Sequence, residues 1–246
     1  MLEIRGLTIV AGGRDLVRDL SLSLPDSGIT ALIGPSGCGK TSVLKWLAGL
    51  AGGPVGRGDL LLDGRPVSRP HPGICYQPQS DALFPWLTIA RNAALGLEVA
   101  GHPRRAAQAR VAPLFAPFGL EGTQGQFPAQ LSGGMRQRAA FLRTIVQDGR
   151  FLLLDEPFSA LDAVTRLRMQ DWLLARLTDH PRGVLLVTHD LHEATGLADR
   201  ILVMAGSPGR IIADIPVPTP HSARTEARMA PLRETLKSLL LEEPPR

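Results

Sequence analysis

A glycine-rich segment near the start of the chain has the residue types and spacing that bind a chain of phosphates. It fits the pattern G-x-x-x-x-G-K-[ST] and comprises Gly34, Pro35, Ser36, Gly37, Cys38, Gly39, Lys40, Thr41 and the following Ser42. The glycines allow backbone N–H groups to point inward, Lys40 reaches the outer phosphates, and the Thr41 hydroxyl is suited to ligate Mg²⁺. An ordinary glycine-rich turn is the alternative, but an apolar run at 29–33 precedes the loop and an apolar-periodic run at 43–50 follows it. This strand–loop–helix context favours phosphate binding.

Two adjacent acids follow a second apolar run. Residues 151–154 are continuously apolar, which is typical of a strand buried on both faces, and they end at Asp155 and Glu156. In open parallel sheets, ligands bind at the carboxyl ends of such strands. An acid pair alone fits an ordinary loop equally well. Together with the phosphate loop, it predicts that Asp155 holds Mg²⁺ and that Glu156 polarises the water that attacks the terminal phosphate.

A third segment predicts another anion site. Leu131-Ser132-Gly133-Gly134-Met135-Arg136-Gln137 places Ser-Gly-Gly directly before a helical run at 135–146. The free N–H groups at the start of a helix attract anions. A chain with one phosphate loop therefore carries a second candidate phosphate contact.

Strand and helix signals alternate along the chain in the order of a parallel sheet. The strand signals are alternating or short apolar runs at residues 2–10, 20–24, 29–33, 59–62, 73–76, 151–154, 184–187, 201–204 and 210–215. Helical spacing dominates residues 88 to 120, with Pro103 placed at a first turn. The strand–helix–strand order after residue 150 indicates a parallel sheet that is covered on its faces.

The composition excludes several classes of protein. The 246 residues are 44% hydrophobic, no apolar run approaches the ~20 residues of a membrane-spanning helix, and the first ten residues lack the features of a signal peptide, so we expect a cytosolic chain. The 27 basic residues include only three lysines and are scattered, and only one tyrosine and three tryptophans are available for base stacking. We therefore expect no nucleic-acid partner. Cys38 and Cys75 have no metal-binding spacing and are expected to be reduced thiols.

Taken in order, these segments resemble the ATP-binding subunits of ABC transporters. The resemblance runs through the phosphate loop, Gln77, the Leu-Ser-Gly-Gly-x-x-Gln segment, Asp155-Glu156, Asp162 and His189. It implies an enzyme that hydrolyses ATP with Mg²⁺. It also implies an α/β fold: a P-loop NTPase core with a mostly parallel sheet, an N-terminal antiparallel β subdomain and an inserted α-helical subdomain.

The resemblance assigns a role to the segment after Leu131. In the family, this segment binds the γ-phosphate held by the phosphate loop of a partner, so Ser132, Gly133, Gly134 and Gln137 are implied to bind nucleotide across an interface. The working unit implied is a head-to-tail dimer of two copies.

Three further residues receive roles by resemblance alone. Gln77 is implied to contact Mg²⁺ and the attacking water and to link the core to the helical subdomain; an ordinary turn residue is the alternative. His189 is implied to contact the γ-phosphate, where the alternative is a structural histidine. Asp162 is implied to couple the two nucleotide sites, although the residue by itself indicates only a helix N-cap.

The chain is expected to form a single ABC ATPase domain. Residues 1–84 and 150–215 would form the nucleotide-binding core, residues 85–149 the helical subdomain with the signature motif, and residues 216–246 a C-terminal tail helix. The bulky segment 83–87 offers a docking site for a partner helix, with packing inside the helical subdomain as the alternative.

The resemblance implies a partner in the membrane. An integral membrane permease would receive the motion of the dimer as it closes on ATP and reopens after hydrolysis. The chain would lie peripherally on the cytoplasmic face of the cell membrane. Segments 83–88 and 207–211 resemble subunits of nitrate, sulfonate and taurine importers, a group whose relatives carry thiamine precursors. Such importers use a periplasmic or lipid-anchored solute-binding protein that reaches the complex through the permease.

Other functions remain open from the sequence. The ATPase of an exporter or of a lipid-extraction complex would have the same catalytic residues. A soluble mechanical ABC ATPase would carry a long coiled coil or two cassettes in tandem. A small-molecule P-loop kinase would lack the segment after Leu131.

One position departs from the family pattern. The family places an adenine-stacking aromatic residue before the Gly-Gly turn of the first hairpin, where this chain has Ala11 before Gly12 and Gly13. An alanine cannot stack on a base. We therefore predict weaker discrimination of ATP from GTP.

Overall fold

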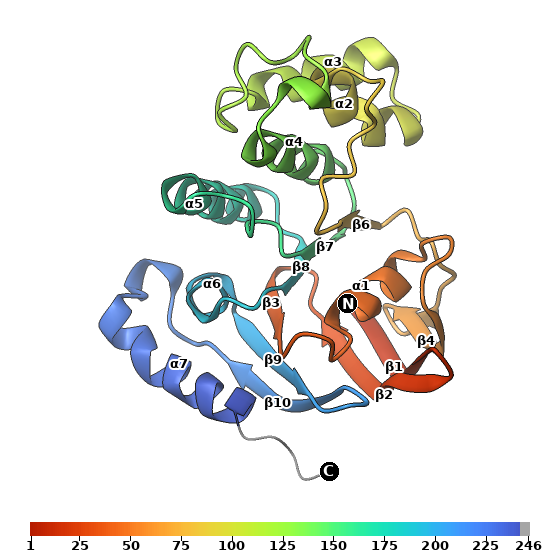
Figure 1. The fold of residues 1–246 in the computed structure, drawn as a ribbon, viewed down its shortest axis with the longest axis vertical. Helices are drawn as coiled ribbons and strands as arrows, with labels where there is room; N and C mark the ends of the chain where they lie inside the picture. The colour runs from red at the N-terminus through yellow and green to blue at the C-terminus, as the bar shows by residue number, and fades with distance from the viewer. Residues whose placement is uncertain (242–246) are drawn as a thin grey trace.

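Two β-sheets form the body of the molecule (Figure 1). The computed structural model describes residues 1–241. The first sheet is antiparallel, with the strand order β2 (Arg14–Leu24), β1 (Leu2–Ala11), β4 (Val55–Leu62) and β5 (Arg65–Pro66). The second has the order β10 (Arg210–Pro216), β9 (Arg200–Ala205), β3 (Gly28–Ile33), β8 (Gly183–Val187), β7 (Phe151–Asp155) and β6 (Ile74–Gln77). Its neighbouring strands are parallel except β10, which runs antiparallel to β9.

Strand β7 separates two hydrophobic cores. All five of its residues are buried. Because side chains alternate along a strand, Leu152 and Leu154 enter one core while Phe151 and Leu153 enter the other. Burial on both faces explains why the strand reads as an unbroken apolar run.

Helix α1 (Lys40–Ala48) fills the core between the two sheets. Four of its apolar side chains pack there with residues of β1, β2 and β7: Val43, Leu44, Trp46 and Leu47. The helix begins three residues before the expected run at 43–50. It ends earlier because Gly49 adopts a left-handed conformation with φ of 65°, which terminates the helical hydrogen bonding.

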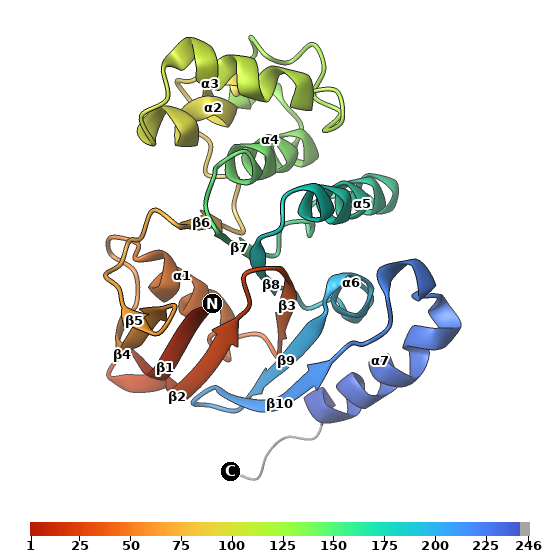
Figure 2. The ribbon, with the colours of Figure 1, turned by 180° about the vertical axis from the view of Figure 1, so that it is seen from behind.

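The helices on the other side of the parallel sheet form the second core. They include α2 (Ile89–Val99), α3 (Arg104–Val111), α4 (Gly133–Ile145), α5 (Ala163–Asp179) and α6 (Leu191–Leu197). Figures 1 and 2 show α2, α3 and α4 gathered at one end of the molecule, beyond α5 and the sheets. Two short 3₁₀ turns, Ala112–Leu114 and Pro128–Gln130, connect α3 to α4.

Aromatic side chains join α4 and the segment that precedes it to the rest of the molecule. The ring of Phe118 lies 4.7 Å from that of Trp172 on α5, and the ring of Phe141 on α4 lies 5.4 Å from that of Phe158, measured between centroids. Both pairs meet edge to face, a favourable arrangement for aromatic rings. Within residues 1–241, no helix has both the length and the apolar character needed to span a membrane.

The last helix of the described residues packs beside α6. After β10 comes the 3₁₀ turn His221–Ala223, then α7 (Glu226–Leu241). The buried Arg233 donates to the Thr195 hydroxyl of α6 over 3.3 Å. The expected tail segment 216–246 includes residues 242–246, which lie outside the described residues.

Three local expectations differ from the structure. The helix expected at 135–146 is α4, which already begins at Gly133 because Ser132 caps it. Gln77, expected after a strand, is the last residue of β6 and pairs with Leu154. In the segment 83–87, Leu83 and Leu87 are buried, so the exposed docking residues are reduced to Phe84, Pro85 and Trp86.

Candidate functional site

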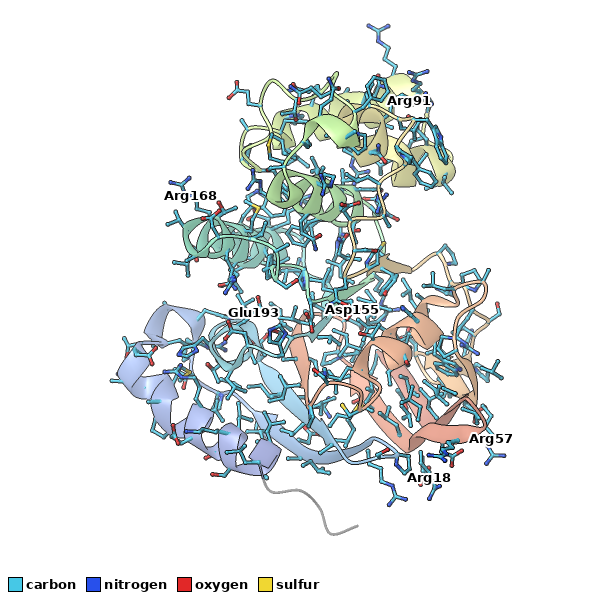
Figure 3. The ribbon with its side chains drawn as sticks, in the orientation of Figure 1. Arg18, Arg57, Arg91, Asp155, Arg168 and Glu193 are labelled. Carbon is cyan, nitrogen blue, oxygen red and sulfur yellow. The ribbon has the colours of Figure 1, made fainter. Side chains whose placement is uncertain are left out.

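The carboxyl ends of four parallel strands bring the predicted site residues to one edge of the sheet. The phosphate loop follows β3, Gln77 ends β6, Asp155 ends β7, and His189 lies two residues beyond β8. Asp155 is in register with Val187 of β8. Figure 3 shows Asp155 at the centre of the molecule, between the sheets and the helices beyond them. The expected crevice at the carboxyl edge is therefore where these residues meet.

The phosphate loop needs its glycines for space and for backbone conformation. A Cβ on Gly34 would lie 2.1 Å from the carbonyl oxygen of Met204, and a Cβ on Gly39 would lie 2.5 Å from the Val17 side chain. Gly39 also has a φ of 105° and precedes α1, whose first turn carries no side-chain cap. The helix start therefore keeps backbone N–H groups for an anion.

Lys40 folds back over the loop. Its ammonium donates to the carbonyl oxygens of Gly34 over 2.7 Å and Pro35 over 2.8 Å. The charge is therefore held against the backbone of the loop, and its expected contact with phosphates stays a prediction. Cys38 is buried beside it, and burial raises the pKa of its thiol; both cysteines are free.

Asp155 and Thr41 present oxygen atoms to each other. The Thr41 hydroxyl donates to Asp155 Oδ1 over 2.9 Å, and the Tyr76 hydroxyl donates to Oδ2 over 3.3 Å. Burial raises the pKa of Asp155, the hydrogen bonds from Thr41 and Tyr76 lower it, and the charge of Glu156 raises it. Within residues 1–241, no three His, Cys, Asp or Glu side chains gather as a metal cluster. One carboxylate with a hydroxyl still fits Mg²⁺, which takes few protein ligands beside substrate phosphates.

Glu156 is held by the strands on both sides of β7. Its φ of 47° lies in the left-handed region, which is unusual for a residue with a side chain and is frequent at functional sites. The Glu156 N–H donates to the Val187 carbonyl over 2.9 Å. His189 Nδ1 lies 3.1 Å from Glu156 Oε1, and Gln79 Nε2 donates to Oε2 over 3.0 Å. Sequence reasoning missed Gln79, because nothing but its closeness to Gln77 marks it.

The side chain of Gln77 faces helix α4. It is fully buried, and its Oε1 accepts a hydrogen bond from the Thr144 hydroxyl over 2.6 Å. Its Nε2 donates to the Pro78 carbonyl over 3.3 Å. Gln77 thus joins the sheet edge to helix α4. Its expected contact with Mg²⁺ stays a prediction.

The segment after Leu131 starts α4. The Ser132 hydroxyl accepts from the N–H of Met135 over 3.3 Å, and Gly133 and Gly134 form the first turn of the helix. The Gln137 amide is buried and donates to the carbonyls of Gln79 and Pro157, each over 3.4 Å. In the described part of the chain, no hydrogen bond connects this segment to the phosphate loop.

Asp162 caps helix α5. Its carboxylate accepts from the N–H of Thr165 over 3.0 Å, and this contact lowers the pKa of the Asp162 carboxyl. The N-cap indicated by the residue alone is confirmed. The coupling role implied by the resemblance stays a prediction.

Comparison with known proteins agrees with this architecture. The model of the protein family described as ABC transporter matches residues 17–159. An aliphatic sulfonates import ATP-binding protein, SsuB 1 of Xanthomonas axonopodis pv. citri, is 43% identical over 93% of this chain and 90% of its own length. The taurine import ATP-binding protein TauB of Rhizobium johnstonii is 37% identical over 90% of this chain and 87% of its own. A solved ATP-binding subunit of an ABC transporter superposes with a TM-score of 0.80 at 24% identity, covering 98% of this chain and 100% of that one.

The fold is that of an α/β P-loop NTPase, as predicted. The solved structures of similar shape include a dimeric bacterial ABC transporter cassette, with a TM-score of 0.79 at 22% identity over 89% of this chain and 100% of that one. The chain belongs to the ABC transporter family.

Proposed function

We propose that this chain is the ATP-hydrolysing subunit of an importer and that it drives a separate membrane permease. The observation that carries the proposal is the convergence at one sheet edge of a phosphate loop, the Thr41–Asp155 pair and the Glu156–His189 pair. These groups are the ones that phosphoryl transfer to water requires: a phosphate cradle, metal-binding oxygens and a carboxylate to orient water.

In the proposed mechanism, the phosphate loop binds and orients ATP. The residues from Gly34 to Ser42 surround the β- and γ-phosphates with N–H groups, and Lys40 exchanges its carbonyl acceptors for phosphate oxygens. Thr41, Asp155 and Gln77 are the residues that would hold Mg²⁺, which neutralises developing charge on the phosphates when bound.

Glu156 accepts the proton of the attacking water in this mechanism. His189 Nδ1 lies beside one carboxylate oxygen, and its imidazole would contact the γ-phosphate from the side of β8. Because the Glu156 N–H donates to the Val187 carbonyl, the backbone of β8 fixes the position from which the Glu156 side chain extends. Positioned acid–base groups of this kind contribute about 10²–10⁴ in rate.

We infer that the site is completed by a second copy in head-to-tail orientation. Ser132, Gly133, Gly134 and Gln137 form a helix start that lies apart from the phosphate loop of the same chain, and Asp162 is exposed beside them at the start of α5. A partner protomer would place its γ-phosphate at this helix start. Closure with ATP and opening after hydrolysis would then provide a two-state motion.

The permease is proposed to dock on the helical region. Phe84 is 39% exposed and Trp86 is 69% exposed, with their rings 5.4 Å apart, so they offer an apolar contact for a partner helix. In this arrangement residues 85–149 act as the coupling subdomain, residues 1–84 and 150–215 as the nucleotide-binding core, and the tail from 216 onward as an appendage. The chain would lie at the cytoplasmic face of the membrane.

The proposed cargo class follows from the relatives. Their names specify import of aliphatic sulfonates and of taurine. Nitrate and thiamine-precursor importers belong to the same expected group. A periplasmic or lipid-anchored solute-binding protein would deliver the cargo to the permease.

Purification of tagged Glu156→Gln with ATP from gently solubilised native membranes tests this proposal. The variant is expected to retain ATP, accumulate as a dimer and bring a multi-span permease that mass spectrometry identifies. An accompanying solute-binding protein would identify an importer and allow its ligand to be screened. Recovery of an intact ATP-bound dimer without a permease would contradict the transport function, and transfer of phosphate to an acceptor other than water would indicate a kinase.

A further inference from the structure

The carboxylate of Glu156 is held by two side chains that come from opposite sides of β7. His189 follows β8 and contacts Oε1, while Gln79 follows β6 and donates its amide to Oε2 over 3.0 Å. Because β6, β7 and β8 are consecutive strands of one sheet, the two contacts hold the carboxylate from either side. Each carboxylate oxygen has a second lone-pair site, which stays available to a water molecule.

Gln79 is also tied to the helical region through its backbone. Its carbonyl oxygen accepts from the Gln137 amide of α4 over 3.4 Å, and that same amide donates to the Pro157 carbonyl, one residue after Glu156. Two chain segments that flank the carboxylate are therefore joined by one buried side chain of α4. A shift of α4 would lengthen or break these two 3.4 Å contacts and so loosen the hold on Gln79 beside Glu156.

We propose that Gln79 is a positioning residue for the hydrolysis step, which fixes the orientation of the Glu156 carboxylate and makes that orientation depend on the place of α4. This inference rests on the proposed role of Glu156 as the group that accepts the proton from water. Gln79 does not bind nucleotide in this scheme. It acts through Glu156, because an oriented carboxylate presents a lone pair to water and a freely rotating one does not.

The donor amide of Gln79 is the feature to remove. Gln79→Leu keeps most of the side-chain volume and deletes the donor, and Gln79→Glu keeps the length but places a second carboxylate against Glu156. A hydrogen bond to a charged group is among the stronger ones in proteins. We expect Gln79→Leu to lower kcat for ATP hydrolysis about three- to tenfold and Gln79→Glu to lower it further, with the KM for ATP unchanged.

Two control variants show whether the effect is local. Ser80→Ala alters the exposed neighbour of Gln79, and Gln108→Leu makes the same chemical change on α3. Both are expected to keep the kcat of the unchanged protein. If Ser80→Ala lowers kcat as much as Gln79→Leu does, the loss comes from loop disturbance and the proposal is wrong.

The decisive measurement is a double-mutant cycle with Glu156→Gln, followed by single-turnover hydrolysis and by ATP binding at equilibrium. Gln79→Leu should cost nothing further once Glu156 has lost its carboxylate. An equal loss in both backgrounds, or a change in KM without a change in kcat, would overturn the positioning role. Failure of the proposed function looks different: Glu156→Gln alone would then hydrolyse ATP normally.

Discussion

The phosphate loop and the start of α4 are two candidate phosphate contacts that differ in how complete each is within one chain. The phosphate loop is surrounded by its partners: Lys40 has two acceptors and Thr41 has Asp155. The start of α4 is capped by Ser132, and a Cβ on Gly134 would lie 3.7 Å from the Ala160 carbonyl oxygen, but among the described residues no hydrogen bond joins this segment to the phosphate loop. One chain therefore folds a complete binding half and a closing half that needs a partner, so binding and hydrolysis should be separable by mutation.

The largest separation is expected at Glu156. Glu156→Gln removes the proton acceptor but keeps the shape, so ATP binding should persist while the hydrolysis rate falls by about 10²–10⁴. Nucleotide titration and phosphate release on the same preparation check both halves of this expectation. Normal hydrolysis by the variant would show that another group accepts the proton.

A smaller loss is expected at the start of α4. Gly134→Glu places a negative charge where the partner's γ-phosphate should arrive, and repulsion should lower hydrolysis by about a hundredfold, which corresponds to about 3 kcal/mol. Binding of ATP to the isolated protomer should stay as it is, because no hydrogen bond within residues 1–241 joins this helix start to the phosphate loop. Ultracentrifugation of Gly134→Glu combined with Glu156→Gln should show loss of the ATP-dependent dimer. A variant that loses ATP affinity as a protomer would refute the separation.

Buried and exposed residues of the segment 83–87 should respond differently to mutation. Leu87 is buried, so Leu87→Ala should lower the free energy of unfolding by about 2–5 kcal/mol. Trp86 is 69% exposed, so Trp86→Ala should change it by less than about 0.5 kcal/mol and should instead weaken stimulation of ATPase activity by the permease. Denaturant unfolding and reconstituted ATPase assays distinguish the two variants. Equal destabilisation would mean that Trp86 belongs to the core.

The smallest predicted effect concerns the base of the nucleotide. Ala11 is exposed at the end of β1 and provides no ring, so ATP and GTP should bind with similar affinity. Ala11→Tyr should strengthen ATP binding about tenfold or more, because a base–aromatic stack contributes about 1–3 kcal/mol. Titration of both variants with ATP and GTP provides the check. A strong preference for ATP in the unchanged protein would show that another residue reads the base.

The sequence predicted the parts of the molecule whose local patterns have one physical explanation. The apolar run before Asp155 requires a strand buried on both faces, and β7 is that strand. The glycines before Lys40 indicate positions with no room for a side chain. The structure agrees, because Met204 lies against Gly34 and Val17 lies against Gly39. Helix ends were less predictable, because the left-handed turn at Gly49 and the cap at Ser132 depend on single residues.

Hydrogen bonds between side chains far apart in the sequence could not be predicted from it. The amide of Gln79 meets Glu156 across 77 positions of the chain, and the hydroxyl of Thr144 meets Gln77 across 67. No periodicity relates such residues, since the contacts arise from how β6, β7 and α4 pack. Leu87 was ambiguous for a similar reason: an apolar residue beside Trp86 fits a surface or a core equally well until its neighbours are known.

The position of β7 between two cores has a consequence for amide hydrogen exchange. Its amides are shielded on both faces and bonded to strands on both sides, so we expect their hydrogens to exchange with solvent only when the whole chain unfolds. Asp155 ends this most persistent segment and Glu156 is the first residue beyond it. The chemistry would then be fixed to the slowest-exchanging part of the protein, with Gln79 and His189 contacting Glu156 from the segments that follow β6 and β8.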